Sequence, residues 1–485
     1  MYEKIHEKVI ERIISIVGKE NVILGKETLE NYAHDETPLY HSMPEVVVKP
    51  INTKQISEIM KIANDNLIPV TPRGGGTSLS AGAVPIYNGI VLSLEKMNHI
   101  KEVDRENLMA IVEPGIITGM MEKELAHSNL FFPPDPVSLD SCTIGGNIAE
   151  CAGGPRAMKY GVTKNYITGL EIVLADGEII KLGGKLLKNV TGYDMIDLFI
   201  GSEGTLGIVT EAIIKTLTLP EFVVDLYIPF KTVSEASKFS IEVLRSGLTP
   251  TAIELMEGDV VRMVEKYLKR NVPYSEANGH TIVEIDGDDK EYIRKMWGKI
   301  GDIALKFNAL DVFVAETIYD RERIWEIRKK IGDSLKSQTK IIAREDLVVP
   351  RDRIPELLNQ LRECVKNFGC ELYAFGHLGD GNMHTDVGYI ENAEKNIEDT
   401  EKITKMRREM YEITIKLGGT ITAEHGVGLS KIHFLSLALD KKTIELMMRI
   451  KKEFDPKNIL NPGKIFTYSE LNHLTIQPFN HLTIL

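Results

Sequence analysis

The sequence has few cysteines and no long hydrophobic run. Of its 485 residues only four are cysteines, at positions 142, 151, 364 and 370, and none belongs to a Cys-x-x-Cys pair. This spacing excludes a zinc ribbon and a thiolate-bound iron–sulfur cluster, and it is not that of a secreted disulfide scaffold. We therefore expect reduced thiols in a cytosolic protein. Because no run reaches 18 apolar residues and the charged N-terminus lacks a signal-peptide core, we expect no membrane span, only attachment through a partner.

Basic residues are in the minority. The chain has 58 Lys and Arg against 70 Asp and Glu, a net charge of −12. A protein that binds nucleic acid normally carries a basic face, so this balance argues against that class. Hydrophobic residues make up 43% and charged residues 26%, as in an ordinary globular enzyme. A chain of this length predicts more than one domain.

Two common phosphate-binding motifs are also absent, since the chain contains neither G-x-G-x-x-G nor a Gly-Lys-Ser/Thr P-loop. It has instead three glycine-rich loops, at residues 71–85, 133–161 and 201–211. Backbone N–H groups in such loops can converge on an anion, although each loop alone could be a flexible turn. Three of them together could line a long ligand that carries a diphosphate. Without the NAD fingerprint, a flavin on a non-Rossmann scaffold fits better than a nicotinamide.

The pattern of predicted elements changes near residue 220. Before it, short strands alternate with helices, such as a helix at 52–67 with Asn52 as its cap. After it, the segments FVVDLYIPF, TAIELME, HTIVEID and LDVFVAET read as strands, between helical stretches at 232–246, 259–270 and 288–307. This arrangement predicts an α+β domain with an antiparallel sheet.

The stretch HLGDGNMH, from His377 to His384, places two histidines on either side of a turn. If Asp380-Gly381 is a two-residue hairpin turn, the histidines face each other with Cβ atoms roughly 4.5–5.5 Å apart. They could then hold one divalent ion, or be an ordinary cross-strand pair. Glu424, in AEHG, offers a carboxylate, and two histidines with one carboxylate are a common set for Zn, Fe or Mn. In an extended segment, the next residue, His425, would point to the opposite side.

Six motifs, taken in order over about residues 20–466, resemble those of the FAD-linked dehydrogenases of D-2-hydroxy acids. This family includes D-lactate dehydrogenases, the flavin subunit of glycolate oxidase and D-2-hydroxyglutarate dehydrogenase, and it belongs to the vanillyl-alcohol-oxidase type of flavoprotein. The motifs are PRGGGTSLSAGAVP, PPDP followed by CTIGGNIAECAGG and KYG, GSEGTLGIVTE, GHLGDGNMH, AEHGVGLSK and DPKNILNPGKIF.

The resemblance implies an α+β fold with several parts. Residues 1–220 would form a vanillyl-alcohol-oxidase-type FAD-binding domain of two α+β subdomains. Residues 221–418 would form a substrate or cap domain whose largely antiparallel sheet is flanked by helices, and 419–466 a C-terminal segment that returns to the FAD domain. Residues 467–485, in which NHLTI occurs twice, would be a peripheral tail to which we assign no function.

The resemblance also implies FAD as the cofactor. We expect non-covalent attachment, because the first loop lacks the histidine that covalently flavinylated relatives often carry there. The first loop would bind the pyrophosphate, the second would flank the flavin and its linker, and the third would lie near the adenosine and isoalloxazine. The residues concerned are Pro72, Arg73, Gly74, Gly75, Gly76, Thr77, Ser78, Pro136, Thr143, Gly146, Asn147, Gly153, Gly154, Glu203, Gly207 and Ile208.

By the same resemblance His377, His384 and Glu424 bind the metal and His425 is the catalytic base. Oxidation of a 2-hydroxy acid removes the hydroxyl proton and a hydride from Cα. A histidine suits the first task because its pKa is near neutral, and flavin N5 accepts the hydride. A bound metal would lower the pKa of the hydroxyl.

The substrate carboxylate requires a cation, and arginine's planar fork suits it. The resemblance favours Arg328, with Arg344 as a second cation. Gly332 stands where relatives often have a hydroxyl residue, and Asn382 is a further candidate for contact with the substrate or its supporting groups.

We therefore expect an FAD- and metal-dependent D-2-hydroxyacid dehydrogenase. D-lactate is the first choice of substrate, because nothing in the sequence indicates a site for a second carboxylate. Electrons would pass to a redox protein such as electron-transfer flavoprotein or an iron–sulfur subunit. The alternative is a glycolate or D-2-hydroxyglutarate dehydrogenase with a quinone or iron–sulfur partner. Two rivals from other classes are a metal-dependent hydrolase, which leaves the glycine loops unexplained, and a non-catalytic flavin- or metal-binding protein.

Overall fold

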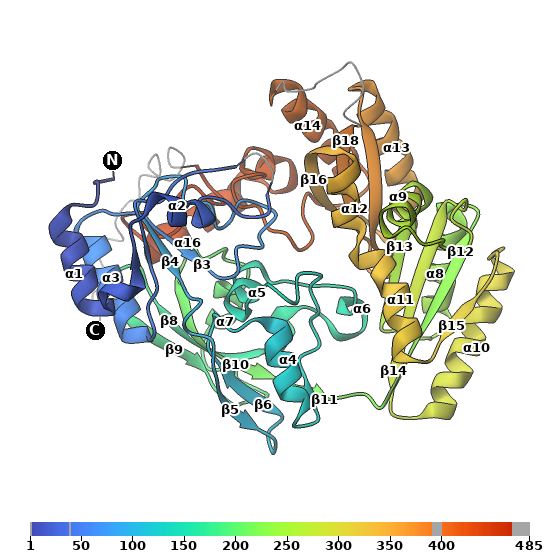
Figure 1. Ribbon diagram of the computed structural model, residues 1–485, viewed down its shortest axis with the longest axis horizontal. Helices are drawn as coiled ribbons and strands as arrows, with labels where there is room; N and C mark the ends of the chain where they lie inside the picture. The colour runs from blue at the N-terminus through green and yellow to red at the C-terminus, as the bar shows by residue number, and fades with distance from the viewer. Residues whose placement is uncertain (1, 38–39, 390–399, 468–485) are drawn as a thin grey trace, which may run out of the picture.

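The computed structural model describes residues 2–37, 40–389 and 400–467, and it combines helices with several sheets (Figure 1). The predicted tail lies outside these residues, apart from Thr467. Two sheets are built from the first 215 residues, and one large sheet follows them in the chain. The mixed α+β class is therefore confirmed. The division into domains at 220, 418 and 466 stays a prediction.

The first sheet has four strands in the order β1-β2-β4-β3. Strands β2, β4 and β3 are parallel, and β1 is antiparallel to β2. Two helices cover it because their apolar stripes pack against its valines and isoleucines, and Asn52 caps the second helix as expected. The elements are β1 Val22–Ile23, β2 Val46–Val48, β3 Val70–Arg73, β4 Ile90–Ser93, α1 Glu7–Val17 and α3 Thr53–Asp65.

The second sheet has five antiparallel strands in the order β5-β6-β10-β8-β9. Short helices pack on it around a second apolar core, and β7 and β11 form a small separate ribbon. The elements are β5 Ile100–Asp104, β6 Met109–Val112, α4 Thr118–Ala126, β7 Leu130–Phe131, α5 Ile144–Glu150, α6 Ala157–Tyr160, β8 Ile167–Val173, β9 Ile179–Gly183, α7 Met195–Phe199, β10 Ile208–Lys215 and β11 Leu217–Thr218.

The large sheet has seven antiparallel strands in the order β15-β12-β14-β13-β17-β18-β16, as the alternation of strands and helices predicted. These strands are β12 Phe222–Phe230, β13 Ala252–Glu257, β14 Gly279–Gly287, β15 Phe313–Ala315, β16 Lys340–Val348, β17 Glu371–His377 and β18 Asn382–Tyr389.

Helices cover both faces of the large sheet (Figure 1). One face packs its core against α8 Val233–Arg245, α10 Lys290–Lys306, α13 Ile354–Asn367 and α14 Thr400–Lys416. The other face packs a smaller core against α9 Gly258–Leu268, α11 Ile318–Lys329 and α12 Ile331–Gln338. The functional side chains described below lie on this second face.

The end of the chain returns to the first sheet, where α16 Lys441–Phe454 lies near β3 and β4 (Figure 1). The N–H of Val70 donates to the carbonyl of Ile459 at 2.7 Å, and the N–H of Asn461 donates to the carbonyl of Val70 at the same distance. The ammonium of Lys451 donates to the carbonyl oxygens of Thr205 and Leu460, both at 2.8 Å. The last helix is therefore tied into the region that holds the glycine loops.

Charged side chains join the large sheet to the part that precedes it. The Arg156 guanidinium lies 3.4 Å from Asp135 and 3.3 Å from Glu284 of β14. Lys159 and Tyr160 both bind the Asp286 carboxylate at the end of the same strand. These contacts hold the large sheet beside the second glycine loop. Among the described residues, no helix combines the length and apolar character needed to cross a membrane.

Candidate active site

A cavity of about 510 Å³ lies between the glycine loops and the large sheet. All the predicted cofactor residues except Gly154 line it, together with Arg328, Arg344, His384, Glu424 and His425. Three loops that are far apart in the sequence thus meet around one space, in the size range of cofactor and ligand sites. The residues present fit a long, phosphate-bearing cofactor.

The first glycine loop follows β3 and packs closely on the second. A Cβ on Gly75 would lie 2.2 Å from the carbonyl oxygen of Ser141, and one on Gly74 would lie 2.3 Å from the Thr143 hydroxyl. Glycine is required here because the backbones of two loops touch. The guanidinium of Arg73 donates to the carbonyl oxygens of His34 and Asn31, at 2.8 and 3.3 Å. Its charge therefore holds the loop in place.

The third glycine loop holds the AEHGVG segment against the cavity. Glu203, in the left-handed region with φ of +53°, accepts hydrogen bonds from the N–H groups of Val427 and Gly428 at 2.7 and 2.6 Å. The segment that carries Glu424 and His425 is thereby attached to the third glycine loop, on one side of the cavity.

The predicted pairing of the HLGDGNMH hairpin is wrong. His377 pairs with Asn382 and His384 pairs with Phe375, so the two histidines are diagonal neighbours. The turn spans residues 378–381, because the Gly379 N–H donates to Ile253 on the adjacent strand β13 at 3.0 Å. The shift is two residues, so both imidazoles still face the same side of the sheet. Their ring centroids are 5.1 Å apart.

Three cross-strand rows of side chains form the sheet wall of the site. Paired residues share a face of the sheet, and residues two apart on one strand do so as well. Row 1 is Glu254, His377 and Asn382; row 2 is Phe375, His384 and Asp346; row 3 is Tyr373, Asp386 and Arg344. Arg328 of α11 covers the first two rows, with its guanidinium carbon 4.8 Å from the centroid of the Phe375 ring.

The ligand atoms suited to a metal converge on the Glu424 carboxylate. Its Oε1 lies 3.6 Å from His377 Nε2, 3.5 Å from His384 Nε2 and 3.7 Å from His425 Nε2. Ligands around Zn²⁺ at 2.0–2.1 Å would be about 3.4 Å apart, so the distances of His377 and His384 from Glu424 fit an ion. The ligand atoms that all lie within 4.8 Å of one another are those of Asp346, His384, Glu424 and His425, a group that does not include His377. Within the described chain, the buried His377 Nε2 has no hydrogen-bond partner. The residues therefore fit a divalent metal.

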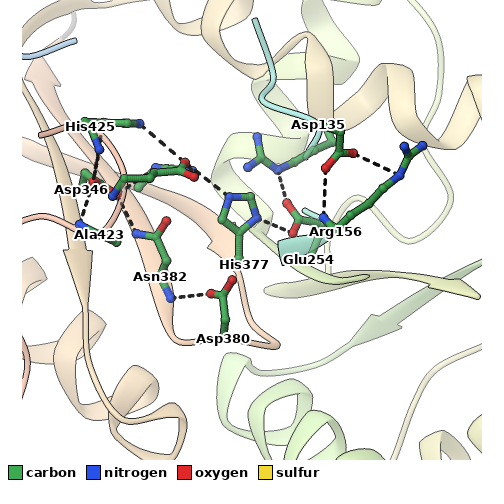
Figure 2. A network of polar contacts seen from close by, with 12 residues as sticks. Asp135, Arg156, Glu254, Asp346, His377, Asp380, Asn382, Ala423 and His425 are labelled. Carbon is green, nitrogen blue, oxygen red and sulfur yellow. Dashed lines mark hydrogen bonds and ion pairs between the residues drawn. The ribbon is translucent and has the colours of Figure 1, made fainter. Parts of the chain in front are cut away.

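His425 does not point away from Glu424 as an extended segment would require. Its ring stacks on His384 at 5.2 Å, with an angle of 3° between the planes. The reason is that residues 423–425 curl, so that their three N–H groups donate to one oxygen of Asp346 at 2.8–2.9 Å. Figure 2 shows His377 between Glu254 on one side and Asp346 and His425 on the other.

Sequence reasoning missed Asp346. Besides the three backbone groups, it accepts hydrogen bonds from the Thr422 hydroxyl at 3.0 Å and the Asn382 amide at 2.6 Å. Burial alone would raise the pKa of the Asp346 carboxyl, but nearby His425 and other positive groups hold it well below its ordinary value. The Asn382 amide donates to Asp346 and to the carbonyl of Leu347. Asn382 therefore supports the site and does not line the cavity.

Glu254 was also missed, and it joins the two halves of the site. One oxygen lies 2.6 Å from His377 Nδ1, and the other accepts from Arg328 Nε at 2.8 Å. Although burial would raise the pKa of Glu254, these two partners lower it. The Arg328 side chain is buried, and its Nη2 has no hydrogen-bond partner among the described residues. The available signal was a charge inside a strand: Glu254 stands between apolar residues of β13, and Asp346 follows Arg344 and Glu345 in β16.

The pKa values of two histidines are shifted in opposite directions. Burial, with repulsion from His377 and His425, lowers the pKa of His384 well below its ordinary value. Burial also opposes the charged form of His377, but Glu254 outweighs it and raises the pKa. A neutral imidazole is the form that binds a metal, and a carboxylate behind a ligating histidine is a common orienting group.

The comparisons with known proteins agree with this geometry. Residues 44–183 match the "FAD binding domain" family and residues 219–465 match "FAD linked oxidases, C-terminal domain". The glycolate oxidase subunit GlcD of Bacillus subtilis (strain 168) is 40% identical over 95% of this chain and 97% of its own. D-lactate dehydrogenase of Anaerostipes hadrus is 34% identical over 96% and 98%. Mitochondrial D-2-hydroxyglutarate dehydrogenase of Arabidopsis thaliana is 31% identical over 97% and 83%.

Solved structures share the fold at low identity. p-Cresol methylhydroxylase superposes with a TM-score of 0.78 at 16% identity, over 97% of this chain and 99% of its own. An alkyldihydroxyacetonephosphate synthase superposes with a TM-score of 0.75 at 20% identity, over 95% and 86%. The fold is thus that of the vanillyl-alcohol-oxidase type. The two family matches and the three relatives at 31–40% identity establish that the chain belongs to the FAD-linked D-2-hydroxyacid dehydrogenases, which are flavoprotein oxidoreductases.

Proposed function

We propose that this chain oxidises a D-2-hydroxy acid, with D-lactate as substrate and pyruvate as product, using non-covalent FAD and a divalent metal. The observation that carries the proposal is convergence: three imidazole Nε2 atoms surround the Glu424 carboxylate, and Glu424, His384 and His425 line the same cavity as the glycine loops. A hydrolase would not need those loops.

His377, His384 and Glu424 would hold the metal, and the glycine loops would hold the FAD. When bound, the metal would polarise the substrate hydroxyl and the flavin N5 would accept the hydride from Cα. The free Nη2 of Arg328 would bind the substrate carboxylate and so orient the hydroxyl toward the histidines.

His425 would remove the hydroxyl proton. Its side chain is 18% exposed, against 3% for His377 and 9% for His384, so it is the most accessible imidazole of the group. Asp346 lies 4.0 Å from its Nδ1, which leaves Nε2 directed at the cluster. His425 would take the hydroxyl proton, and a flavin held by the glycine loops would supply the hydride acceptor that leaves the keto acid as product.

The proposal is tested by mixing the anaerobic holoprotein with D- and L-lactate, glycolate and D-2-hydroxyglutarate, with and without a chelator. We expect D-lactate to bleach the visible flavin band, and bleaching to slow at least tenfold after metal removal. Bleaching by L-acids alone would overturn the stereochemistry, and full activity after verified metal loss would remove the metal from the mechanism. His425→Asn should bind flavin and metal but bleach at least 100-fold more slowly, because a general base contributes about 10²–10⁴-fold.

We further propose that the electrons leave to a redox protein, such as electron-transfer flavoprotein or an iron–sulfur subunit. The sequence contains no Cys-x-x-Cys pair that could hold a cluster of its own. Steady-state turnover should rise when electron-transfer flavoprotein is added to the purified holoprotein. Rapid reduction of a quinone analogue, with no effect of the flavoprotein, would refute this acceptor.

A further inference from the structure

We infer that the pair Arg344 and Asp386 restricts this site to 2-hydroxy acids that carry a single carboxylate. The inference rests on the proposed function and names the chemical class of its substrate. Relatives of similar identity act, by their names, on acids that differ at the end away from the hydroxyl, so overall similarity does not choose among these substrates. We base the choice on the charged residues at the far end of the cavity, beside row 3.

Arg344 and Asp386 form row 3 of the sheet wall and lie directly opposite each other on β16 and β18. Both line the cavity, and Arg344 Nε is 3.8 Å from Asp386 Oδ2. Row 3 lies two residues beyond His384, which is about 6.6–6.8 Å along the strand. A carboxylate on the fourth or fifth carbon of an extended hydroxy acid would reach this row if its hydroxyl lay at the metal cluster.

Arg328 and Arg344 differ in their countercharges. Arg328 shares Glu254 with His377, so one carboxylate serves two cationic groups, and its Nη2 remains free for substrate. Arg344 instead faces Asp386, a buried carboxylate. The opposing charge cancels the attraction that a second substrate carboxylate would need, and it repels that carboxylate at short range.

The other charged residues described around this end do not supply a buried free cation. Glu36 and Asp333 also line the cavity, and their bases Lys336 and Lys330 are each held at 2.9 Å. Glu345, a further lining residue, binds Arg407. Lys329 also lines the cavity, but it is exposed at the surface, where water and salt screen its charge.

Space is not what excludes a longer acid. Gly332 lines the cavity, and a Cβ built there meets no described atom within 4 Å. The far end is open but electrically balanced. The discrimination is therefore electrostatic, and an isosteric change of one side chain should relax it.

The test compares kcat/KM for D-2-hydroxyglutarate and D-lactate in the holoenzyme and in Asp386→Asn. Wild type should prefer D-lactate, and the ratio of D-2-hydroxyglutarate to D-lactate should rise about 10- to 100-fold in the variant, as the loss of one nearby negative charge predicts. Asp333→Asn is the matched control, a lining acid already paired with Lys330, and its ratio should change less than about twofold.

Binding supplies a second readout that does not depend on turnover. Titration of the oxidised holoprotein with 2-oxoglutarate and with pyruvate, followed by the flavin absorbance, should show the same shift in relative affinity in Asp386→Asn. If that variant retains no flavin, Asp386→Ser replaces it. A ratio unchanged in the variant would overturn the inference and leave the proposed function standing. Wild type that prefers D-2-hydroxyglutarate would overturn both the inference and the choice of D-lactate, while oxidation of a D-2-hydroxy acid would remain. Failure of every hydroxy acid to bleach the flavin would refute the proposed function, and the titration would still decide the role of Asp386.

Discussion

The substitution Asp346→Asn removes one buried charge and keeps the shape of the side chain. One carboxylate oxygen accepts from the N–H groups of residues 423–425 and from the Thr422 hydroxyl, and the other accepts from the Asn382 amide. An amide has one acceptor oxygen and one NH₂ group. Whichever way it turns, its NH₂ faces donors, either the amide of Asn382 or the three backbone groups.

The energetic cost follows from these bonds. A hydrogen bond to a charged group contributes about 1.5–3 kcal/mol, and one between neutral groups about 0.5–1.5 kcal/mol. In the better orientation the bond to Asn382 is lost and the four others lose their charge assistance. Because the four remaining bonds share one oxygen, their losses do not add in full. We expect the free energy of unfolding to fall by about 3–5 kcal/mol, as when a buried charged pair is broken, which corresponds to roughly 6–20 °C in Tm for a unit of about 200 residues.

Differential scanning calorimetry and metal analysis of the purified variant provide the assay. Metal content should fall together with Tm, because the curled segment carries Glu424. In the double variant Asp346→Asn, Asn382→Asp the donor and acceptor are exchanged, and at least half of the lost stability should return. Asp352→Asn, whose side chain is 66% exposed, should shift Tm by less than about 2 °C. A variant at position 346 that melts within 2 °C of wild type and retains its metal would refute the reasoning.

The other predictions use different parts of the fold. Burial lowers the pKa of His280 to about 4 from 6.5; below pH 6.5 the unfolded chain therefore binds a proton that the folded protein does not, and the free energy of unfolding should fall by about 2 kcal/mol between pH 7.5 and 5. Urea unfolding of His280→Gln should show a smaller loss of unfolding free energy over that pH range. An equal loss would show that His280 does not cause the pH dependence. Gly75→Ala should lower flavin occupancy by pushing two loops apart, whereas Gly184→Ala, with no described atom within 4 Å of its Cβ, should retain wild-type flavin; equal occupancy in both would contradict the tight packing. Glu254→Gln should raise KM for the hydroxy acid and lower metal content together, because one carboxylate orients a ligand and the substrate-binding arginine; a change in only one of these would separate the two roles.

Local patterns in the sequence were sufficient for much of the fold. The cap residue Asn52, the alternation after residue 220 and the glycine-rich loops each reflect chemistry within a few neighbouring residues, and the structure has them where they were expected. The hairpin at His377 was misjudged because the Gly379 N–H is bound by β13, a strand more than a hundred positions earlier. A rule that uses only the residues of the turn cannot predict a hydrogen bond to a strand so distant in the sequence.

The acids that support the site, Glu254 and Asp346, could not be assigned from the sequence for the same reason. Glu254 stands between apolar residues and Asp346 ends the charged run Arg344-Glu345-Asp346, which marks both strands as unusual but does not name the partners of these acids. Their roles depend on which strands lie side by side and in what register. Residues 423–425 likewise curl because the carboxylate of Asp346 accepts hydrogen bonds from their three N–H groups. The direction of the His425 side chain could therefore not be predicted from the neighbouring residues.

The contact of residues 459–461 with the first sheet has a consequence for biogenesis. Val70, which leads into the first glycine loop, exchanges backbone hydrogen bonds with Ile459 and Asn461, almost 400 positions later. A protein is synthesised from its N-terminus, so this loop leaves the ribosome long before residues 459–461 exist. Cofactor loading is therefore expected to be a late, post-translational event, and nascent or prematurely terminated chains should emerge colourless.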